Sequence, residues 1–329
     1  MTNMPQSTDR IIAEISTVLA QETAIASPRL EQTCTDIAAA HNQGSKNHVL
    51  GFLYYGSSLR DVDDASKMLD FYVIIDSYKT VHKGRPVRQF INRMIPPVVY
   101  YYEREDINED GQSTLTTCKY SLISLPEFER RCTRSAMLSV IWGRFSQPSL
   151  LYFPLTETIK SRILTARANA VLHLARSTEG LFNTPADNCL TDAVSFWGRG
   201  FRESYRTELR PESSEGRSKE IVVKYEQRYT QLMNIIYGPP NADGHYALPA
   251  ASKPQAQRQW WRRRLIGKPI TGLRVLCNAM TFDGGLDYVL RKVERHSGVT
   301  IEPTPFQQKH PVLCSPILGW KLWRKGAFN

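Results

Sequence analysis

The sequence predicts an α+β protein: a mixed sheet in the first domain, then a mostly helical second domain and a basic C-terminal segment. Three observations support this prediction. Short apolar and aromatic runs typical of strands are concentrated before residue 126. Apolar residues at helical spacing dominate from 156 to 237, and positive charge accumulates after residue 252.

The elements of the first part follow the chain in order. Ile11 to Leu19 carry apolar side chains at helical spacing behind Ser7, which is a typical helix start. Gly143 and Pro148 are expected to break the secondary structure of the stretch that follows residue 132. We expect four strands and one further helix within VLGFLYYGSS (49–58), LDFYVIID (69–76), PPVVYYYERE (96–105), TTCKYSLISL (116–125) and PEFERRC (126–132).

The second part changes in character. Two or three helices are expected between 156 and 237, interrupted by a polar loop at 210–219. The stretch 238–255 is rich in Gly, Pro and Ala and is typical of a linker. A chain of 329 residues can form more than one core, so we place the domain boundaries at 1–155, 156–240 and 241–329.

Composition excludes several classes of protein. No window has the roughly 18 to 20 uninterrupted apolar residues that a membrane span needs. The first residues include Asp9 and Glu14 and lack the layout of a secretory signal. Six widely spaced cysteines without a C-x-x-C pair are typical neither of a zinc site nor of a disulfide framework. We therefore expect a cytoplasmic protein with buried free thiols.

The net charge of +10 is confined to the last quarter of the chain. From residue 253 onward there are fourteen Lys or Arg and four acids, so the first 252 residues are neutral. Four of the six tryptophans also lie there: Trp260, Trp261, Trp320 and Trp323. This composition predicts a polyanionic partner, which is a membrane surface, a nucleic acid or a phosphorylated ligand.

The sharpest motif is Gly56-Ser57-Ser58-x-Arg60, followed by Asp70 inside the next strand. Small residues at a turn after a strand let backbone N–H groups approach a nucleotide phosphate, and a hydroxyl adds a donor. A carboxylate on the neighbouring strand can hold Mg²⁺ against the same phosphates. The pattern is typical of polymerase-β-type nucleotidyltransferases, although a tight turn beside a structural acid gives the same letters.

The second metal ligand of that motif is missing. It would stand two residues after Asp70, where this chain has Tyr72. Asp76 is on the same side of the strand but roughly 20 Å farther along it, too far to share one ion. Glu103, at the end of the third strand, is the candidate for a second carboxylate.

Four segments occur in a particular order: YYGSSLR, MLDFYVIID, CKYSLIS and WGRFSQP. Together they resemble the motifs of mitochondrial-type phosphatidate cytidylyltransferases, the translocator assembly and maintenance family, which make CDP-diacylglycerol. The resemblance covers about residues 50 to 155. It implies that Gly56 and Ser57 hold the triphosphate of CTP, that Asp70 is the catalytic Mg²⁺ ligand, and that Lys119 neutralises phosphate charge beside Tyr120.

The resemblance continues less completely toward the C-terminus. Arg144 matches a nucleotide-binding Arg of the family, whereas Gln147 stands where the family has Lys. The family's C-terminal basic motif is not recognisable. Arg291, Lys292 and Arg295 lie at helical spacing, and they form either a cationic patch for the phosphatidate headgroup or a solvated helix face.

These observations lead to one expected function and two alternatives. The expected function is Mg²⁺-dependent transfer of CMP from CTP to phosphatidate. The enzyme would be peripheral to the inner face of a membrane, bound through the Trp-rich basic stretches 258–268 and 319–328 without nucleic acid. The alternatives are a nucleotidyltransferase acting on RNA or protein, and a non-catalytic basic binding protein. The sequence does not indicate the oligomeric state.

Overall fold

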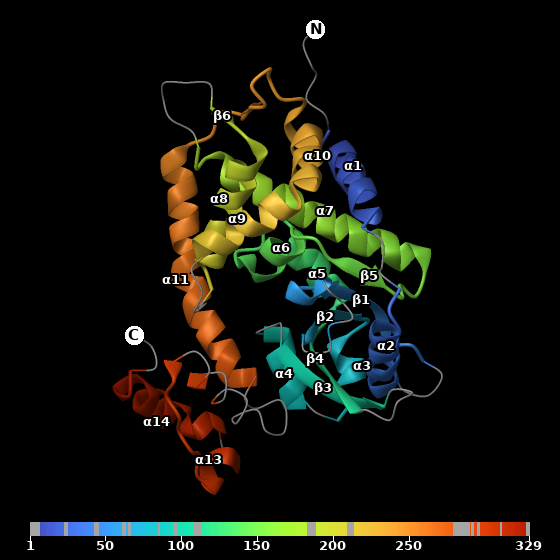
Figure 1. Ribbon diagram of the computed structural model, residues 1–329, viewed down its shortest axis with the longest axis vertical. Coiled ribbons are helices and arrows are strands. Elements are labelled where there is room, and N and C mark those ends of the chain that lie inside the picture. Colours follow the sequence, from blue (N-terminus) through green and yellow to red (C-terminus); the bar gives the residue numbers. More distant parts are fainter. Residues whose placement is uncertain are drawn as a thin grey trace. The chain divides into compact units, whose positions relative to one another are not determined.

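The structure is a computed structural model (Figure 1). It describes residues 7–22, 26–42, 46–60, 64, 67–84, 86–94, 98–107, 113–182, 189–208, 214–278, 290, 293–294, 297–309 and 311–326. Over these ranges, no helix combines the length and the apolar character needed to cross a membrane.

A mixed five-stranded sheet confirms the predicted α+β class. Its strands lie in the order β3-β4-β2-β1-β5, and the pairs β1–β5 and β3–β4 are antiparallel. The short strands β6 and β7 form a separate antiparallel pair. The strands are β1 (Val49–Tyr55), β2 (Leu69–Ile75), β3 (Val98–Ile107), β4 (Ser113–Ser124), β5 (Leu150–Tyr152), β6 (Leu190–Thr191) and β7 (Tyr246–Ala247).

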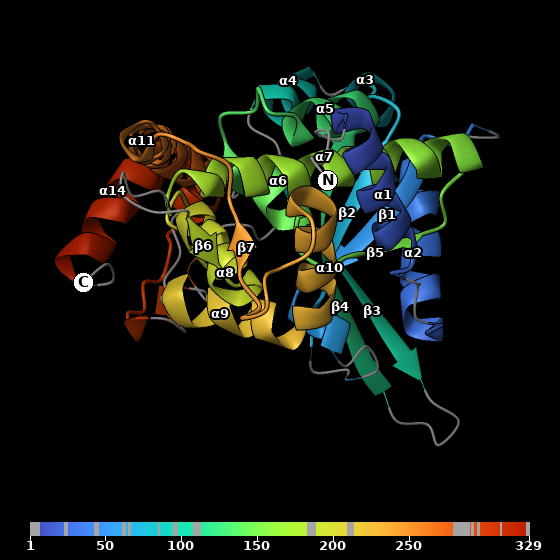
Figure 2. The same cartoon turned by 90° about the horizontal axis from the view of Figure 1, so that it is seen from above.

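The four predicted strands are confirmed as β1 to β4. Strands β1 and β2 are almost wholly buried, which explains why their sequences are continuous apolar runs and do not alternate. Strands β3 and β4 run side by side as a long hairpin (Figure 2). Strand β5 was not predicted, because its three residues are too few to give a periodic signal.

The chain divides into two compact units. Unit 1 comprises Met1–Ile25, Leu50–Tyr55 and Ser124–Pro269, and unit 2 comprises Ala26–Val49, Gly56–Ile123 and Ile270–Asn329. The domain boundaries expected from the sequence stay a prediction. The helices of unit 1 are α1 (Thr8–Ala20), α5 (Leu125–Cys132), α6 (Ser139–Phe145), α7 (Glu157–Glu179), α8 (Ala193–Tyr205), α9 (Ser214–Lys224), α10 (Glu226–Tyr237) and the part of α11 (Lys253–Asn278) that ends at Pro269.

Unit 1 is organised around α7, which contacts α1, α5, α6 and α8 (Figure 1). The predicted first helix is confirmed as α1, and the Ser7 hydroxyl caps it by accepting from the backbone N–H of Arg10. The predicted helix at 126–132 is confirmed as α5, with proline in its first turn. These contacts bury the apolar stripe of α7, which is the periodic signal seen in the sequence.

Three expectations for unit 1 were wrong. Between residues 157 and 237 the described residues form four helices, α7 to α10, where two or three were expected. The expected polar loop at 210–219 becomes helix from Ser214, because α9 packs on α8 and buries Ser218 and Val222. Gly143 does not end a helix. It lies inside α6, where a Cβ atom would collide with the Ser204 hydroxyl, so its missing side chain permits close packing on α8.

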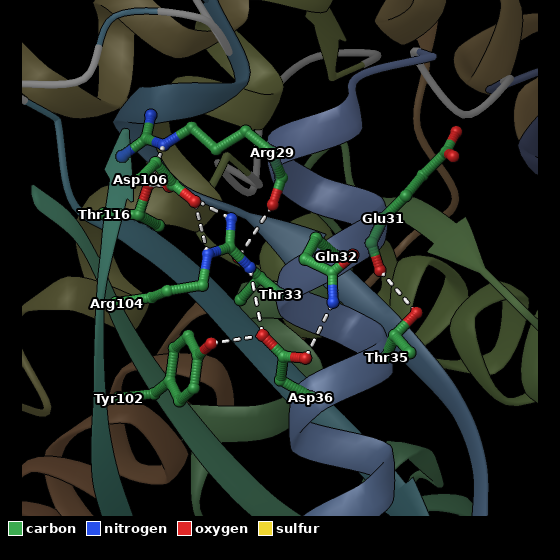
Figure 3. A network of polar contacts seen from close by, with 10 residues as sticks. All are labelled: Arg29, Glu31, Gln32, Thr33, Thr35, Asp36, Tyr102, Arg104, Asp106 and Thr116. Carbon is green, nitrogen blue, oxygen red and sulfur yellow. Dashed lines mark hydrogen bonds and ion pairs between the residues drawn. The ribbon is translucent and has the colours of Figure 1, made fainter. Parts of the chain in front are cut away.

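Unit 2 contains β2, β3 and β4 with helix α2 on one face of the hairpin. Figure 3 shows the polar contacts between α2 and the hairpin: Asp36 accepts hydrogen bonds from Tyr102 and from Arg104, whose Nη1 lies 3.0 Å away. Arg104 also pairs with Asp106, which accepts from Thr116. Helix α2 is Pro28–His41. The other helical segments described in this unit are the 3-10 turn η1 (Ser57–Arg60), α3 (Tyr78–Val81), α4 (Pro86–Met94), the end of α11 from Ile270, α13 (Pro305–Lys309) and α14 (Pro311–Arg324).

The thiols agree with expectation in the described part of the chain. Five cysteines are free there, and four of them are buried: Cys34, Cys118, Cys132 and Cys314. Burial raises the pKa of three of these thiols, those of Cys34 on α2, Cys118 on β4 and Cys132 on α5. These cysteines therefore pack as small apolar side chains.

Candidate functional site

The turn after β1 lies directly beside the acid of β2. Gly56 has φ +102°, a conformation that favours glycine. A Cβ atom on Gly56 would lie 2.8 Å from Asp70 Oδ2, which is closer than a normal contact. The glycine is therefore required both by the backbone angle and by the approach of the carboxylate. The structure brings together the two segments that the sequence analysis paired.

Asp70 forms an ion pair with Lys119 across the neighbouring strands β2 and β4. Lys119 Nζ lies 3.0 Å from Asp70 Oδ1. The two side chains are 18% and 29% exposed, so the pair is accessible to solvent at its edge and is not enclosed in the core. A carboxylate and a cation with partial access can exchange this contact for one to a bound ligand.

The serines of the turn differ in exposure. Ser57 is exposed, whereas Ser58 is fully buried and its hydroxyl has no hydrogen-bond partner among the described residues. A ligand can therefore reach Ser57 in this structure but not the hydroxyl of Ser58. Arg60 is the last residue of η1, and its predicted role in nucleotide binding stays a prediction.

The position of the expected second carboxylate on β2 holds a buried tyrosine, Tyr72. Glu103 on β3 is exposed and lies opposite Thr117 of β4. Two residues earlier on β3, Tyr101 lies opposite Lys119. Glu103 therefore shares a face of the hairpin with Lys119, one strand farther from β2.

A magnesium ion at Asp70 would be held by a single carboxylate of the protein. Across the described ranges there is no group of three or more His, Cys, Asp or Glu side chains that could hold a metal ion. Mg²⁺ is commonly bound by one or two carboxylates together with substrate phosphates and water. Asp70 fits the first of these roles beside the turn, and Glu103 as a second ligand stays a prediction.

Asp76, at the far end of the same strand segment, has a structural role. It accepts from the Thr80 hydroxyl at 2.6 Å, pairs with His48 Nδ1 at 2.8 Å and accepts from the Ser77 backbone N–H. Burial opposes ionisation of Asp76, but these hydrogen bonds outweigh it and lower its pKa. Its oxygens are therefore committed to the start of α3 and to His48.

The side chain of Tyr120 does not lie on the same face of β4 as that of Lys119. Successive residues of a strand point to opposite faces, so Tyr120 faces away from Asp70. Its hydroxyl lies 3.0 Å from His41 Nε2, and its ring stacks on Tyr100 at a centroid distance of 5.4 Å. Burial raises the pKa of Tyr120 and lowers that of His41 to about 4. This cluster anchors α2 to β3 and β4.

The remaining predicted residues are distributed as follows. In unit 1, the guanidinium of Arg144 lies over the Tyr55 ring at 4.7 Å, a cation–π contact. Gln147, at the position where the resembled family has Lys, donates to the Gly143 carbonyl at 3.2 Å. The predicted headgroup patch of Arg291, Lys292 and Arg295 lies outside the described residues.

The basic Trp-rich stretches are only partly available to a membrane. Trp260 is fully buried in unit 1 and donates to the Ser177 carbonyl at 2.8 Å, so the expectation of an interfacial indole was wrong for this residue. Trp261, Trp320 and Trp323 are each more than half exposed. Trp320 also carries the guanidinium of Arg324 at 4.8 Å.

Helix α14 is amphipathic within unit 2. Leu318 and Leu322 are buried with Cys314 and Leu290, and Val293, Val299 and Ile301 pack against this cluster. The exposed side of the helix carries tryptophans and basic residues, including Lys321 and Arg324. Such a face suits the headgroup layer of an anionic membrane.

A second candidate site was missed in the sequence. It is a cavity of about 250 Å³ in unit 1 with four arginines in its lining. The signal that could have indicated it is the spacing of Ala256, Trp260, Arg263 and Gly267, which places an arginine on the buried face of α11.

Comparison with known proteins adds no family assignment: no model of a protein family matches this chain, and no curated protein matches it significantly. The resemblance to phosphatidate cytidylyltransferases therefore depends on the four sequence motifs, and it stays a prediction.

Proposed function

We propose that this chain is a nucleotidyltransferase of the polymerase-β type that transfers CMP from CTP to phosphatidate, yielding CDP-diacylglycerol and pyrophosphate. The observation that carries the proposal is the contact of the Gly56 turn with Asp70, which is itself paired with Lys119. A backbone turn, one carboxylate and one lysine at a partly exposed position are the groups that bind a magnesium–triphosphate complex.

The reaction requires charge neutralisation more than proton transfer. A phosphate oxygen of phosphatidate is already anionic, and it attacks the α-phosphorus of CTP. A new P–O bond forms while the bond to the α–β bridging oxygen breaks, and pyrophosphate leaves with that electron pair. Lys119 and the turn N–H groups neutralise the phosphates, and a magnesium ion held by Asp70 would supply further positive charge.

Ligand binding would change the partners of the ion pair. Lys119 and Asp70 neutralise each other without substrate. With a nucleotide bound, Lys119 would pair with a phosphate oxygen and Asp70 would hold the divalent ion, so neither charge would be left unpaired.

The acceptor would be reached at a membrane. We propose that the protein is cytoplasmic and peripheral to the inner face of the membrane, with Trp320 and Trp323 of α14 in the headgroup layer. Their exposure and the neighbouring Lys321 and Arg324 support this part of the proposal.

The test is a transfer assay with labelled CTP, Mg²⁺ and vesicles that contain phosphatidate. Asp70→Asn keeps the side-chain shape and removes the charge, and we expect CDP-diacylglycerol formation to fall at least about 100-fold. Lys119→Met should have an effect of similar size. Glu105→Gln, an exposed acid on β3, is the matched control and should retain activity.

A non-catalytic binding protein is the second candidate. It is favoured by one observation: Tyr72 replaces the second acid, so that Lys119 balances the charge of Asp70. In this case wild type would bind CTP but form no product with phosphatidate. Labelled nucleotide appearing in RNA or protein would instead indicate another acceptor. Full activity in Asp70→Asn would contradict the proposed site.

A further inference from the structure

The cavity of unit 1 has an unusual charge. Four arginines line it, Arg134, Arg176, Arg262 and Arg263, together with His173 and other neutral residues, and none of its described lining residues is acidic. Arg134 and Arg262 are exposed, whereas Arg263 and His173 are buried. The cavity of about 250 Å³ thus has exposed cations at its rim and a buried cation, Arg263, at its bottom.

Arg263, at the bottom of the cavity, is held between two buried indoles. The guanidinium carbon of Arg263 lies 5.0 Å from the Trp142 ring centroid and 4.8 Å from that of Trp260. The indole N–H groups donate to backbone carbonyls, Trp260 to Ser177 and Trp142 to Ala136. Both rings are fully buried, so the orientation of Arg263 is fixed before any ligand binds.

Arg263 remains a cation without a counter-ion in the described structure. Burial lowers its pKa to about 10, so it is charged at neutral pH. Its Nη2 lies 3.2 Å from His173 Nε2, and a guanidinium can only donate, so His173 accepts as a neutral ring. Its Nη1 is buried and has no hydrogen-bond partner among the described residues.

No acid described beside the cavity neutralises the charge of Arg263. Burial, Arg263 and Arg134 lower the pKa of His173 to about 3, which keeps the ring neutral. Glu179 is the acid that acts on Arg176 and Arg134, but it does not line the cavity, and it accepts from the Tyr237 hydroxyl at 2.9 Å. Buried charges in proteins are normally paired, so the missing partner of Arg263 indicates a ligand.

We propose that this cavity binds a phosphomonoester dianion. A phosphomonoester carries two negative charges and three terminal oxygens. The arginines belong to α7, to the segment before α6 and to α11, and Ser177 of α7 also lines the cavity. Cations from several directions suit a tetrahedral dianion better than a planar carboxylate with one charge.

The evidence for this cavity does not depend on the proposed transfer reaction. All residues that line the cavity belong to unit 1, whereas Gly56, Asp70 and Lys119 belong to unit 2. The phosphomonoester can be a soluble metabolite or the headgroup of phosphatidate, since both present the same group.

The experiment measures binding to the full chain without CTP or Mg²⁺. Glycerol 3-phosphate is titrated by calorimetry, and vesicles with phosphatidate are compared with vesicles carrying the same surface charge as phosphatidylglycerol, a phosphodiester. The test variant is the double substitution Arg134→Ala and Arg262→Ala, two exposed residues whose loss should not disturb folding. Lys219→Ala, which removes an exposed cation of α9 in the same unit but outside the cavity lining, is the matched control.

We expect the double variant to bind the phosphomonoester at least tenfold more weakly, while the control binds like wild type. Binding of glycerol 3-phosphate identifies a soluble ligand. Preference for phosphatidate vesicles without it identifies a lipid headgroup. The proposal is overturned if wild type binds neither probe, or if the double variant binds as tightly as wild type. The binding assay contains neither CTP nor Mg²⁺, so its outcome is separate from that of the transfer assay.

Discussion

One of two buried arginine clusters in unit 1 contains an acid, and the other does not. In the first cluster, Glu22 lies between Arg167 and Arg228, with distances of 2.5 Å from Oε2 to Arg167 Nη2 and 2.6 Å from Oε1 to Arg228 Nε. In the second, Arg263 lies between two indoles and its hydrogen-bond acceptor is the neutral His173.

The acid determines what each cluster can do. Burial alone would raise the pKa of Glu22, but the charges of Arg167 and Arg228 outweigh it and lower the pKa. The cluster joins the end of α1 to α7 and α10, and each of its two arginines forms an ion pair with the carboxylate of Glu22. Arg263 has no such partner in the described chain, so its charge remains available to an anion. We infer that the first cluster stabilises the fold and the second binds a ligand.

The largest expected effect is that of Glu22→Gln. The substitution keeps the shape but leaves two buried guanidiniums with only a neutral amide, and breaking a buried ion pair costs about 3–5 kcal/mol. We expect a loss of free energy of unfolding in this range, measured by urea denaturation at pH 7.

Glu14→Gln is the matched control for this prediction. Glu14 lies on α1 in an exposed ion pair with Arg10, and such pairs contribute about 0.2–1 kcal/mol. If Glu22→Gln loses no more stability than Glu14→Gln, the first cluster does not have the structural role assigned to it.

The lowered pKa of Glu22 gives a pH dependence with a definite sign. A carboxyl whose folded-state pKa lies below its ordinary value of 4.5 stabilises the protein fully above that value. This contribution decreases as the pH falls from 4.5 through the folded-state pKa. The stability difference between wild type and Glu22→Gln should therefore narrow below pH 4.5 in urea titrations. A constant difference down to pH 3 would show that the pKa of Glu22 is not lowered by folding.

The sheet site was largely predictable from the sequence. The strands flanking the Gly56 turn are short apolar runs, and a glycine at a positive φ angle is a local property. Asp70 interrupts such a run with a charge, which marks it as exceptional. The face of β4 that carries Lys119 follows from alternation, and the same rule places Tyr120 on the other face, which the sequence interpretation overlooked.

The arginine cavity could not be predicted in the same way. Trp142, His173 and Arg263 come from three separate helices, and their meeting depends on how α6, α7 and α11 pack. The stretch RQWWRRR has the composition of a solvated or membrane-facing surface. Only the packing shows that Trp260 is buried while Trp261 is exposed. Spacing identifies the buried face of such a helix, but it does not identify the partner that covers it.

The smallest expected effect on stability is that of Arg263→Met, and it tests the comparison most directly. Removing an unpaired buried cation relieves its desolvation cost, while the lost cation–π contacts and the lost bond to His173 act in the opposite direction. We expect the free energy of unfolding to remain within about 1 kcal/mol of wild type, measured in urea without phosphate. Arg167→Met makes the same change at another buried arginine but takes a partner from Glu22. It should therefore be destabilised by clearly more than Arg263→Met, and equal losses would mean that Arg263 has a structural partner and is not held for a ligand.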